Sequence, residues 1–117
     1  MVVDMDCLFC RIVGGDVPAD VVYETDTVVA FRDTNPQAPV HVLVVPKVHH
    51  DDIREIAEAE DELVGDIVRA ASAVAEIEHV DTTGFRLVFN TGAGAGQTMF
   101  HAHGHVLGGR QLGHLAG

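Results

Sequence analysis

Positive charge is scarce in this 117-residue chain, which has 7 Lys and Arg residues against 18 Asp and Glu and a net charge of −11 at pH 7. Lys47 is the only lysine. A protein that binds nucleic acid through its phosphates needs a basic surface that displaces counterions, and this sequence offers none. We therefore expect that nucleic acid is not a main ligand.

Aromatic residues and long apolar runs are also lacking. The chain has no Trp and one Tyr, so it cannot build the aromatic platform on which single-stranded nucleic acid stacks. No apolar run approaches the roughly 18 residues that a membrane-spanning helix requires. The first residues carry no basic region before the apolar ones, which argues against a secretion signal. We expect a cytoplasmic protein with no membrane partner.

The remaining composition is that of a folded domain with an unusual surface. At 47% hydrophobic residues, a chain of this length is expected to bury one core, so we predict a single domain over residues 1–117. An acidic surplus with almost no lysine is typical of a surface adapted to high salt, where self-repulsion is screened. An ordinary acidic cytosolic protein is the alternative.

The hydrophobic pattern predicts short strands around one long helix. Apolar residues recur at helical spacing over 56–79, with acidic residues on the other face. A short helix is predicted at 7–13, ended by Gly14 and Gly15. Alternating or β-branched runs predict five strands, at 21–23, 27–31, 41–45, 85–90 and 101–107. We predict an α+β fold: an antiparallel five-stranded sheet with one long and one short helix, packed on one face.

Three of the eight histidines form a row: His101, His103 and His105 alternate with Ala102 and Gly104. Successive side chains of a strand point to opposite faces and each residue rises about 3.3 Å, so the three rings would share one face roughly 6.6 Å apart. Such a row can bind a metal, or it can bind an anion and attack it as a nucleophile.

A glycine-rich segment, residues 90–98, leads into this row. Glycine lets backbone N–H groups approach an anion closely, and the Asn, Gln and Thr side chains of the segment add donors. Such a loop alone is often only a turn. Placed directly before a strand of histidines, it predicts a phosphate-binding loop.

The run from His101 to Arg110 resembles the signature of the histidine triad proteins, His-φ-His-φ-His-φ-φ with φ hydrophobic. Further segments match the order and spacing of that family, so the resemblance covers nearly the whole chain. Its length and its Gly-Gly-Arg-Gln ending resemble the Hint-like branch. The matching segments are 7–12, 30–33, 36–39, 41–47, Asn90 and 96–98.

The resemblance implies a mechanism. Family members bind a nucleoside monophosphate unit and cleave the bond between its α-phosphorus and a leaving group. The middle histidine, here His103, would attack phosphorus and form a nucleotidyl-histidine that water hydrolyses. His105, Gln97 and Thr98 would donate to the phosphoryl oxygens. The remaining implied residues support this centre: Asn90 and Gly96 in the loop, and His41 and His101, which would position the ring of His103.

The resemblance also implies a nucleoside-binding site. Asp33 would hold the ribose hydroxyls through charge-assisted hydrogen bonds, with Thr34 beside it. Asp33 could instead cap a turn. The apolar walls around the base would be Leu8, Phe9, Ile12, Phe31 and Leu43, some of which could also be core residues.

Cys7 and Cys10 form a lone Cys-x-x-Cys pair, which supplies only two of the four ligands of a tetrahedral zinc site. Two buried cysteines without a metal are the alternative reading. By resemblance to zinc-containing family members, His49 and His101 would complete a structural Zn²⁺ site, although His50 could compete with His49. No organic cofactor is expected.

The predicted function is hydrolysis of nucleoside phosphoramidates, with a purine base and an AMP-type moiety, or of related nucleotide conjugates. The alternatives are a dinucleoside polyphosphate hydrolase and a zinc-stabilised nucleotide-binding module with incidental catalysis. A homodimer built through the long helix and edge strands is implied by resemblance.

Two features depart from the family pattern. Gly104 stands where the family has a bulky apolar residue, so a nearby helix could approach more closely there. The tail, residues 113–117, lacks the aromatic residue that is common at this place in the family, where the tail often shapes leaving-group selectivity.

Overall fold

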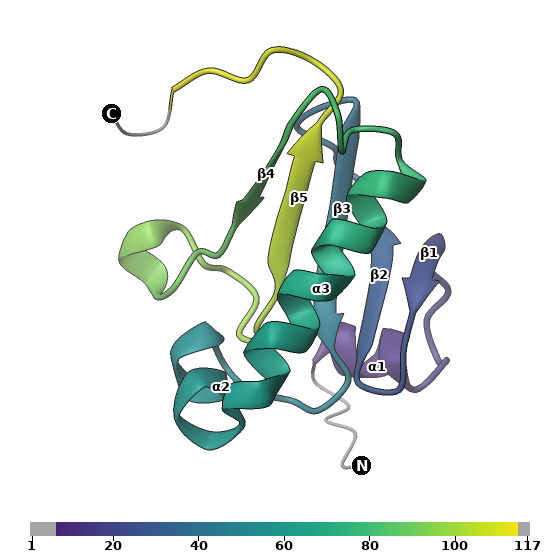
Figure 1. The fold of residues 1–117 in the computed structure, drawn as a ribbon. Helices are drawn as coiled ribbons and strands as arrows, with labels where there is room; N and C mark the ends of the chain where they lie inside the picture. The colour runs from purple at the N-terminus through teal and green to yellow at the C-terminus, as the bar shows by residue number, and fades with distance from the viewer. Residues whose placement is uncertain (1–6, 115–117) are drawn as a thin grey trace.

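A computed structural model describes residues 7–114 as one antiparallel sheet with helices on both of its faces (Figure 1). The strand order β1-β2-β3-β5-β4 confirms the predicted α+β class. The strands are β1 (Val21–Glu24), β2 (Val28–Arg32), β3 (Val40–Pro46), β4 (Phe85–Val88) and β5 (Gly104–Gly108). The helices are α1 (Leu8–Val13), α2 (Ile53–Ala59), α3 (Asp61–Ile77) and the 3₁₀ turn η1 (Ala93–Ala95). Residues 1–6 and 115–117 lie outside the described residues. They include both ends of the predicted domain and the last part of the tail.

Both faces of the sheet are apolar, which explains why helices cover both. In β2, Val28 and Ala30 belong to the core beneath α3, whereas Val29 and Phe31 belong to a second core with Phe9 of α1. The strand is buried at four consecutive positions, as expected where both faces are covered. The prediction that the helices share one face was therefore wrong: α1 lies behind the sheet in Figure 1, and α3 lies in front.

The predicted helix over 56–79 is divided in two. Asp52 begins α2 by accepting the backbone N–H of Glu55 at 3.0 Å, as an N-cap residue does. Glu60 has φ −146° and ψ 68°, which is not helical, and its carboxylate lies 2.6 Å from Nε2 of His50. We attribute the break to this long-range contact, which the helical spacing of the sequence does not reveal.

The last strand begins later than predicted, at Gly104 instead of residue 101. Neighbouring side chains fill the space that a larger residue would occupy at Gly104. A Cβ atom there would lie 2.9 Å from Cδ1 of Leu87 and 3.0 Å from Cε1 of Phe89. The expectation that a helix moves closer was wrong, because side chains at and just beyond β4 pack against Gly104 instead.

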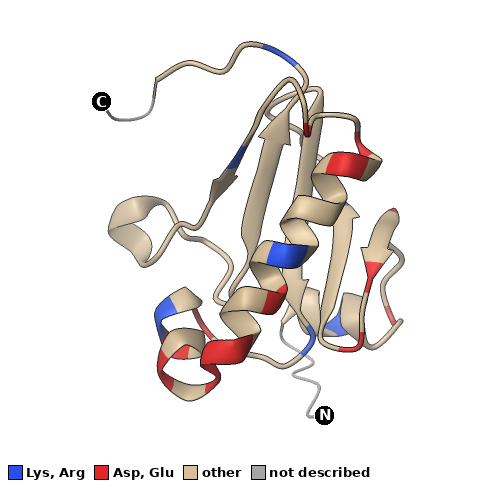
Figure 2. Ribbon diagram, viewed as in Figure 1, with Lys and Arg blue, Asp and Glu red and all other residues tan. Residues whose placement is uncertain are grey.

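Acidic side chains gather on α2 and on the first turn of α3 (Figure 2). Asp61 and Glu62 lie at the amino end of α3, where negative charge interacts favourably with the helix dipole. None of the helices within residues 7–114 combines the length and apolarity needed to cross a bilayer. Adaptation of this surface to high salt stays a prediction.

Candidate functional site

A cleft of about 380 Å³ opens on the α1 face of the sheet, a volume within the range of small-molecule sites. It brings together residues from α1, β2, β3 and the segment on either side of the start of β5. Ten of the residues singled out in the sequence line it: Leu8, Phe9, Ile12, Phe31, Asp33, Thr34, Leu43, Thr98, His103 and His105.

Other lining residues were missed by the sequence reasoning. They are Val17, Pro18, Ala19, Asp20, Arg32 and Met99. The segment 17–20 precedes β1 and looks like a plain connection in the sequence. Arg32 contacts this segment through a 2.9 Å salt bridge with Asp20, and it also forms a salt bridge with Glu78. Because these partners are far apart in the chain, no local motif indicates them.

The histidine rings converge more closely than a regular strand would place them. The ring centroids of His103 and His105 are 4.9 Å apart, and those of His41 and His105 are 5.2 Å apart. Phe9 of α1 packs edge-on against His103 at 5.0 Å. His101 and His103 precede β5, so the spacing of a regular strand does not apply to them.

Backbone hydrogen bonding fixes which nitrogen of His103 can react. Its Nδ1 lies 2.8 Å from the carbonyl oxygen of His101, and a carbonyl can only accept, so Nδ1 carries the proton. The lone pair is therefore on Nε2. Burial lowers the pKa of His103, opposed by this same hydrogen bond. The result is a neutral imidazole that can act as a nucleophile.

The same reasoning shows which nitrogen of His105 carries the proton, because His105 contacts His41. The backbone N–H of Gln37 donates to Nδ1 of His41 at 3.0 Å, so the proton of His41 is on Nε2. That Nε2–H faces Nδ1 of His105 at 2.9 Å, which leaves a proton on Nε2 of His105. His41 therefore orients His105, not the ring of His103 as predicted. His101 positions His103 through its carbonyl and not through its ring.

Asp33 lies at the edge of this pair and has two contacts. Its Oδ1 accepts the backbone N–H of Asn35 at 2.8 Å, and its Oδ2 is 3.5 Å from Nε2 of His41. The ligand atoms of Asp33, His41 and His105 lie within 4.8 Å of one another. A metal there would need the lone pair of His41 on Nε2, and the N–H of Gln37 favours the opposite tautomer. We assign no metal to this group.

Burial of His105 predicts a loss of stability in acid. Burial, with smaller effects of His103 and His41, lowers its pKa from 6.5 to about 4. Between these values the unfolded chain binds more protons, so the free energy of unfolding falls as the pH drops from 6.5 toward 4. With allowance for solvent screening we expect a loss of about 1–2 kcal/mol. Urea unfolding at several pH values measures it.

The variant His105→Asn isolates this effect, because other buried histidines contribute in both proteins. Its free energy of unfolding should depend less on pH than that of the wild type. Equal pH dependence of the two proteins would contradict the assignment of a buried, neutral His105.

Two of the three glycines in the glycine-rich loop use their backbone N–H groups for hydrogen bonds inside the protein. The backbone N–H of Gly92 donates to Oε1 of Gln97 at 2.8 Å, and that of Gly96 donates to the carbonyl of Ala93 at 3.0 Å. Nε2 of Gln97 donates to the carbonyls of Asp51 and Met99. Gln97, Gly96 and Asn90 do not line the cleft. Thr98 and Met99, directly after the loop, do.

Four potential metal ligands lie close together beside the segment that carries His103. The ligand atoms of Cys7, Cys10, His49 and His101 all lie within 4.8 Å of one another. Nδ1 of His101 is 3.3 Å from Sγ of Cys7 and 3.5 Å from Sγ of Cys10, and Nδ1 of His49 is 3.2 Å from Sγ of Cys10. Ideal tetrahedral zinc places sulfur and nitrogen ligands roughly 3.6 Å apart. The cluster fits a closed, structural Zn²⁺ site.

The far nitrogens of both imidazoles have partners suited to metal ligands. Nε2 of His101 lies 2.8 Å from the carbonyl of Pro46, and Nε2 of His49 lies 3.2 Å from Oδ1 of Asp51. Both acceptors hold the proton on Nε2 and leave Nδ1 for the metal. Burial lowers the pKa of His101 to about 4, which keeps this ring neutral.

His50 faces away from the cysteines and pairs with two carboxylates. Its Nδ1 is 3.1 Å from Glu55 and its Nε2 is 2.6 Å from Glu60. Burial works to lower the pKa of His50, but these contacts outweigh it and raise the pKa. The geometry therefore places His49, and not His50, at the metal cluster.

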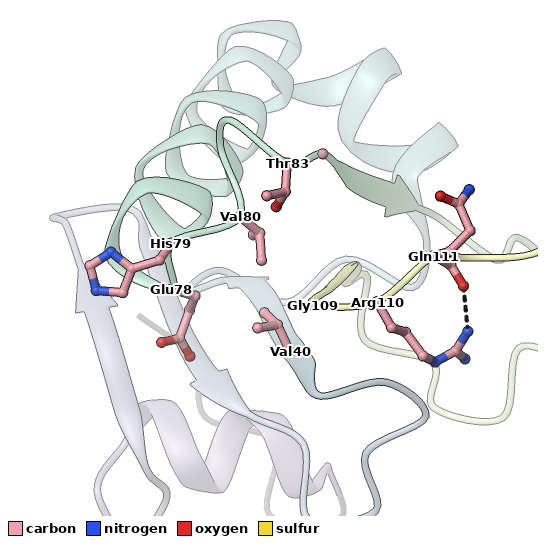
Figure 3. A pocket seen from close by; sticks show the side chains of 9 residues that line it. Val40, Glu78, His79, Val80, Thr83, Gly109, Arg110 and Gln111 are labelled. Carbon is pink, nitrogen blue, oxygen red and sulfur yellow. Dashed lines mark hydrogen bonds between the residues drawn. The ribbon is translucent and has the colours of Figure 1, made fainter.

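A second cavity, of about 460 Å³, is lined by the start of β3, the segment between α3 and β4 and the residues after β5 (Figure 3). Its charged groups are engaged within the protein. Glu78 pairs with Arg32 at 2.9 Å, and Arg110 donates to the carbonyls of Gln111 and Gln37. None of the predicted site residues lines it. We therefore place the functional site in the cleft beside the histidines.

Comparison with known proteins agrees with this geometry. A HIT domain family description matches residues 14–112. The purine nucleoside phosphoramidase of Escherichia coli is 37% identical over 108 residues, covering 92% of this chain and 91% of the relative. A 14 kDa zinc-binding protein of Zea mays is 42% identical over 112 residues, covering 93% and 86%.

Solved structures give the same result. A HIT family hydrolase from Legionella pneumophila superimposes with a TM-score of 0.89 at 44% identity and covers 95% of this chain and 99% of its own. A histidine triad protein from Clostridium difficile has a TM-score of 0.92 at 42% identity, with 97% and 98% covered. The chain therefore belongs to the histidine triad (HIT) family.

Proposed function

We propose that this protein hydrolyses nucleoside phosphoramidates, with a purine nucleotide as the AMP-type moiety and His103 as the nucleophile. The observation that carries the proposal is the unprotonated Nε2 of His103, fixed by the carbonyl of His101 at 2.8 Å in a cleft with apolar walls. The name of the Escherichia coli relative supports the substrate class. We also propose a cytoplasmic location, because nucleotides are abundant in the cytoplasm.

The reaction would proceed in two displacements. Nε2 of His103 attacks the α-phosphorus, the phosphorus–nitrogen bond breaks, and the amine departs with a proton taken from water. The imidazolium formed keeps its Nδ1–H bonded to the carbonyl of His101. Water then attacks the nucleotidyl-histidine, the bond between phosphorus and Nε2 breaks, and the nucleoside monophosphate and the neutral ring are released. The proton that this water loses neutralises the hydroxide left when the amine was protonated. Splitting the displacement into two steps lowers each barrier.

The neighbouring residues would stabilise charge and hold the nucleotide. Nε2–H of His105 and the hydroxyl of Thr98 would donate to phosphoryl oxygens, where preorganised donors are worth about 3–4 kcal/mol in comparable sites. Asp33 would accept from the ribose hydroxyls, with Thr34 adjacent. The base would lie among Leu8, Phe9, Ile12, Phe31 and Leu43.

The metal would stabilise the fold and would take no part in the reaction. Cys7, Cys10, His49 and His101 provide a full set of four ligands, so no coordination position is left for substrate. The zinc-binding relative from Zea mays supports Zn²⁺ as the ion. When bound, the ion would join α1 to the segment that carries His103.

An assay with two substrates tests the function. We expect rapid hydrolysis of an adenosine phosphoramidate to AMP and amine, and slower hydrolysis of a diadenosine polyphosphate. Preference for the polyphosphate would support the dinucleoside polyphosphate hydrolase instead. AMP binding with neither reaction would support the nucleotide-binding module.

We further propose a homodimer formed through β4 and the outer face of α3. β4 is at the edge of the sheet, and an edge strand presents unpaired backbone groups. Large exposed apolar residues lie on both elements: Phe85 on β4, and Val68 and Ile77 on α3.

Sedimentation should give twice the chain mass of 12.5 kDa, and Val68→Glu should shift the protein toward the monomer. A wild-type monomer at micromolar concentration would contradict this proposal.

A further inference from the structure

We propose that Gln97 is a positioning residue, which fastens the glycine-rich loop to the backbone of Asp51 and makes no contact with the phosphate. The inference rests on the proposed function, because it concerns the same reaction centre. It replaces the role implied by family resemblance, in which the side chain of Gln97 donates to phosphoryl oxygens.

The side-chain amide of Gln97 is fully used inside the protein. Nε2 donates to the carbonyl of Asp51 at 2.7 Å and to that of Met99 at 3.0 Å. Oε1 accepts the backbone N–H of Gly92 at 2.8 Å. An amide nitrogen has two protons, so no donor remains for a ligand. The residue is only 5% exposed and does not line the cleft.

These contacts join the loop and the residue that follows it to Asp51, which is 46 positions away in the sequence. Gly92 begins the loop, Asp51 follows β3, and Met99 belongs to the chain that leads to the histidines. A second anchor lies close by, where the N–H of Ala102 donates to the carbonyl of His50 at 2.7 Å. The stretch 98–101 is therefore held at both ends against residues 50 and 51. Thr98, which lines the cleft, is in this stretch.

The loop needs such an anchor because its own backbone is permissive. Gly92 and Gly96 have φ of 84° and 90°, a region that glycine enters freely and other residues rarely adopt. Glycine-rich chain also loses more conformational entropy on ordering. We infer that the Gln97 amide selects the one loop conformation in which the Thr98 hydroxyl faces the phosphate.

Loss of the anchor should affect the reaction more than substrate binding. The ribose and base would contact α1, β2 and β3, whereas the hydrogen bonds of the Gln97 side chain go to Gly92, Asp51 and Met99. A displaced donor costs transition-state stabilisation, and misplacement by about 1 Å can cost about 100-fold in rate. We expect kcat to fall about 10- to 100-fold in Gln97→Met, while KM changes by less than about threefold.

The experiment compares two variants with a control. Gln97→Met keeps the length of the side chain and removes all three hydrogen bonds. Gln97→Glu keeps an acceptor for the N–H of Gly92 but removes the amide donors. Gln111→Glu makes the same chemical change at an exposed position. For each protein, kcat and KM for an adenosine phosphoramidate, the unfolding midpoint, and amide hydrogen exchange over residues 91–99 without ligand are measured.

The expected result is faster exchange over residues 91–99 and a lower kcat in both Gln97 variants, with Gln111→Glu like the wild type. A lower kcat with wild-type exchange and a KM raised well beyond threefold would assign Gln97 to the phosphate and overturn the proposal. Faster exchange with unchanged kcat would also overturn it. If Gln97→Met does not fold, the kcat and the hydrogen exchange of Gln97→Glu decide between these outcomes. If the wild type lacks phosphoramidase activity, the proposed function fails, and the exchange data still test the anchor.

Discussion

Replacing His103 by Ala should lower kcat for an adenosine phosphoramidate by at least about 10⁴-fold, the scale seen when a covalent nucleophile is removed. No other ring in the cleft can substitute for it. The proton of His105 on Nε2 follows from its contact with His41, so His105 presents a donor to the substrate. The ring of His101 faces the cysteines. Initial rates over a range of substrate concentrations measure the loss.

The same variant should still bind AMP, with an affinity within about tenfold of the wild type, or 1.4 kcal/mol. Binding would depend chiefly on the apolar walls and Asp33, which the substitution leaves in place. His79→Asn, at an exposed position outside the cleft, is the control and should turn over normally. Acid quenching of the wild type during turnover should trap a nucleotidyl adduct on the peptide that contains His103. A His103 variant with the wild-type rate, or a wild type that never yields the adduct, would contradict the mechanism.

The strands could be predicted because their cause is local. The run from Val40 to Pro46 has the β-branched residue valine at four of its seven positions, and it forms the buried central strand. The division between α2 and α3 could not be predicted in this way. Asp61 continues the helical pattern, and the break depends on Glu60 turning its carboxylate toward His50.

The site shows the same division between local and distant causes. The alternation of His101, His103 and His105 predicts that these rings act together, and they do lie at one cleft and its adjoining metal cluster. The protonated nitrogen of His101 and of His105 depends on groups that are distant in sequence, and the carbonyl of Pro46 determines it for His101. The tautomer of His105 is set by His41, 64 positions earlier in the chain, and that of His41 by the N–H of Gln37. Only the folded structure brings these groups together.

Removing the metal should destabilise the protein strongly. We expect about one zinc per purified chain, and its removal by chelation or by Cys10→Ser should lower the free energy of unfolding by about 4 kcal/mol, the effect of a ligand present at about 1,000 times its Kd. The reason is that the ligands come from three places. Cys7 and Cys10 flank the start of α1, His49 follows β3, and His101 precedes β5. Elemental analysis and urea unfolding provide the measurements.

The adjacent histidines supply a matched pair of variants for this site. His49→Asn should lose zinc, because Nδ1 of His49 is 3.2 Å from Sγ of Cys10. His50→Asn should keep zinc, because the ring of His50 lies between the carboxylates of Glu55 and Glu60. The opposite pattern would move the ligand to His50. A wild-type protein with well under one zinc per chain, and with a stability that chelators do not change, would show that the two thiols and two imidazoles stabilise the fold by their own packing and hydrogen bonds.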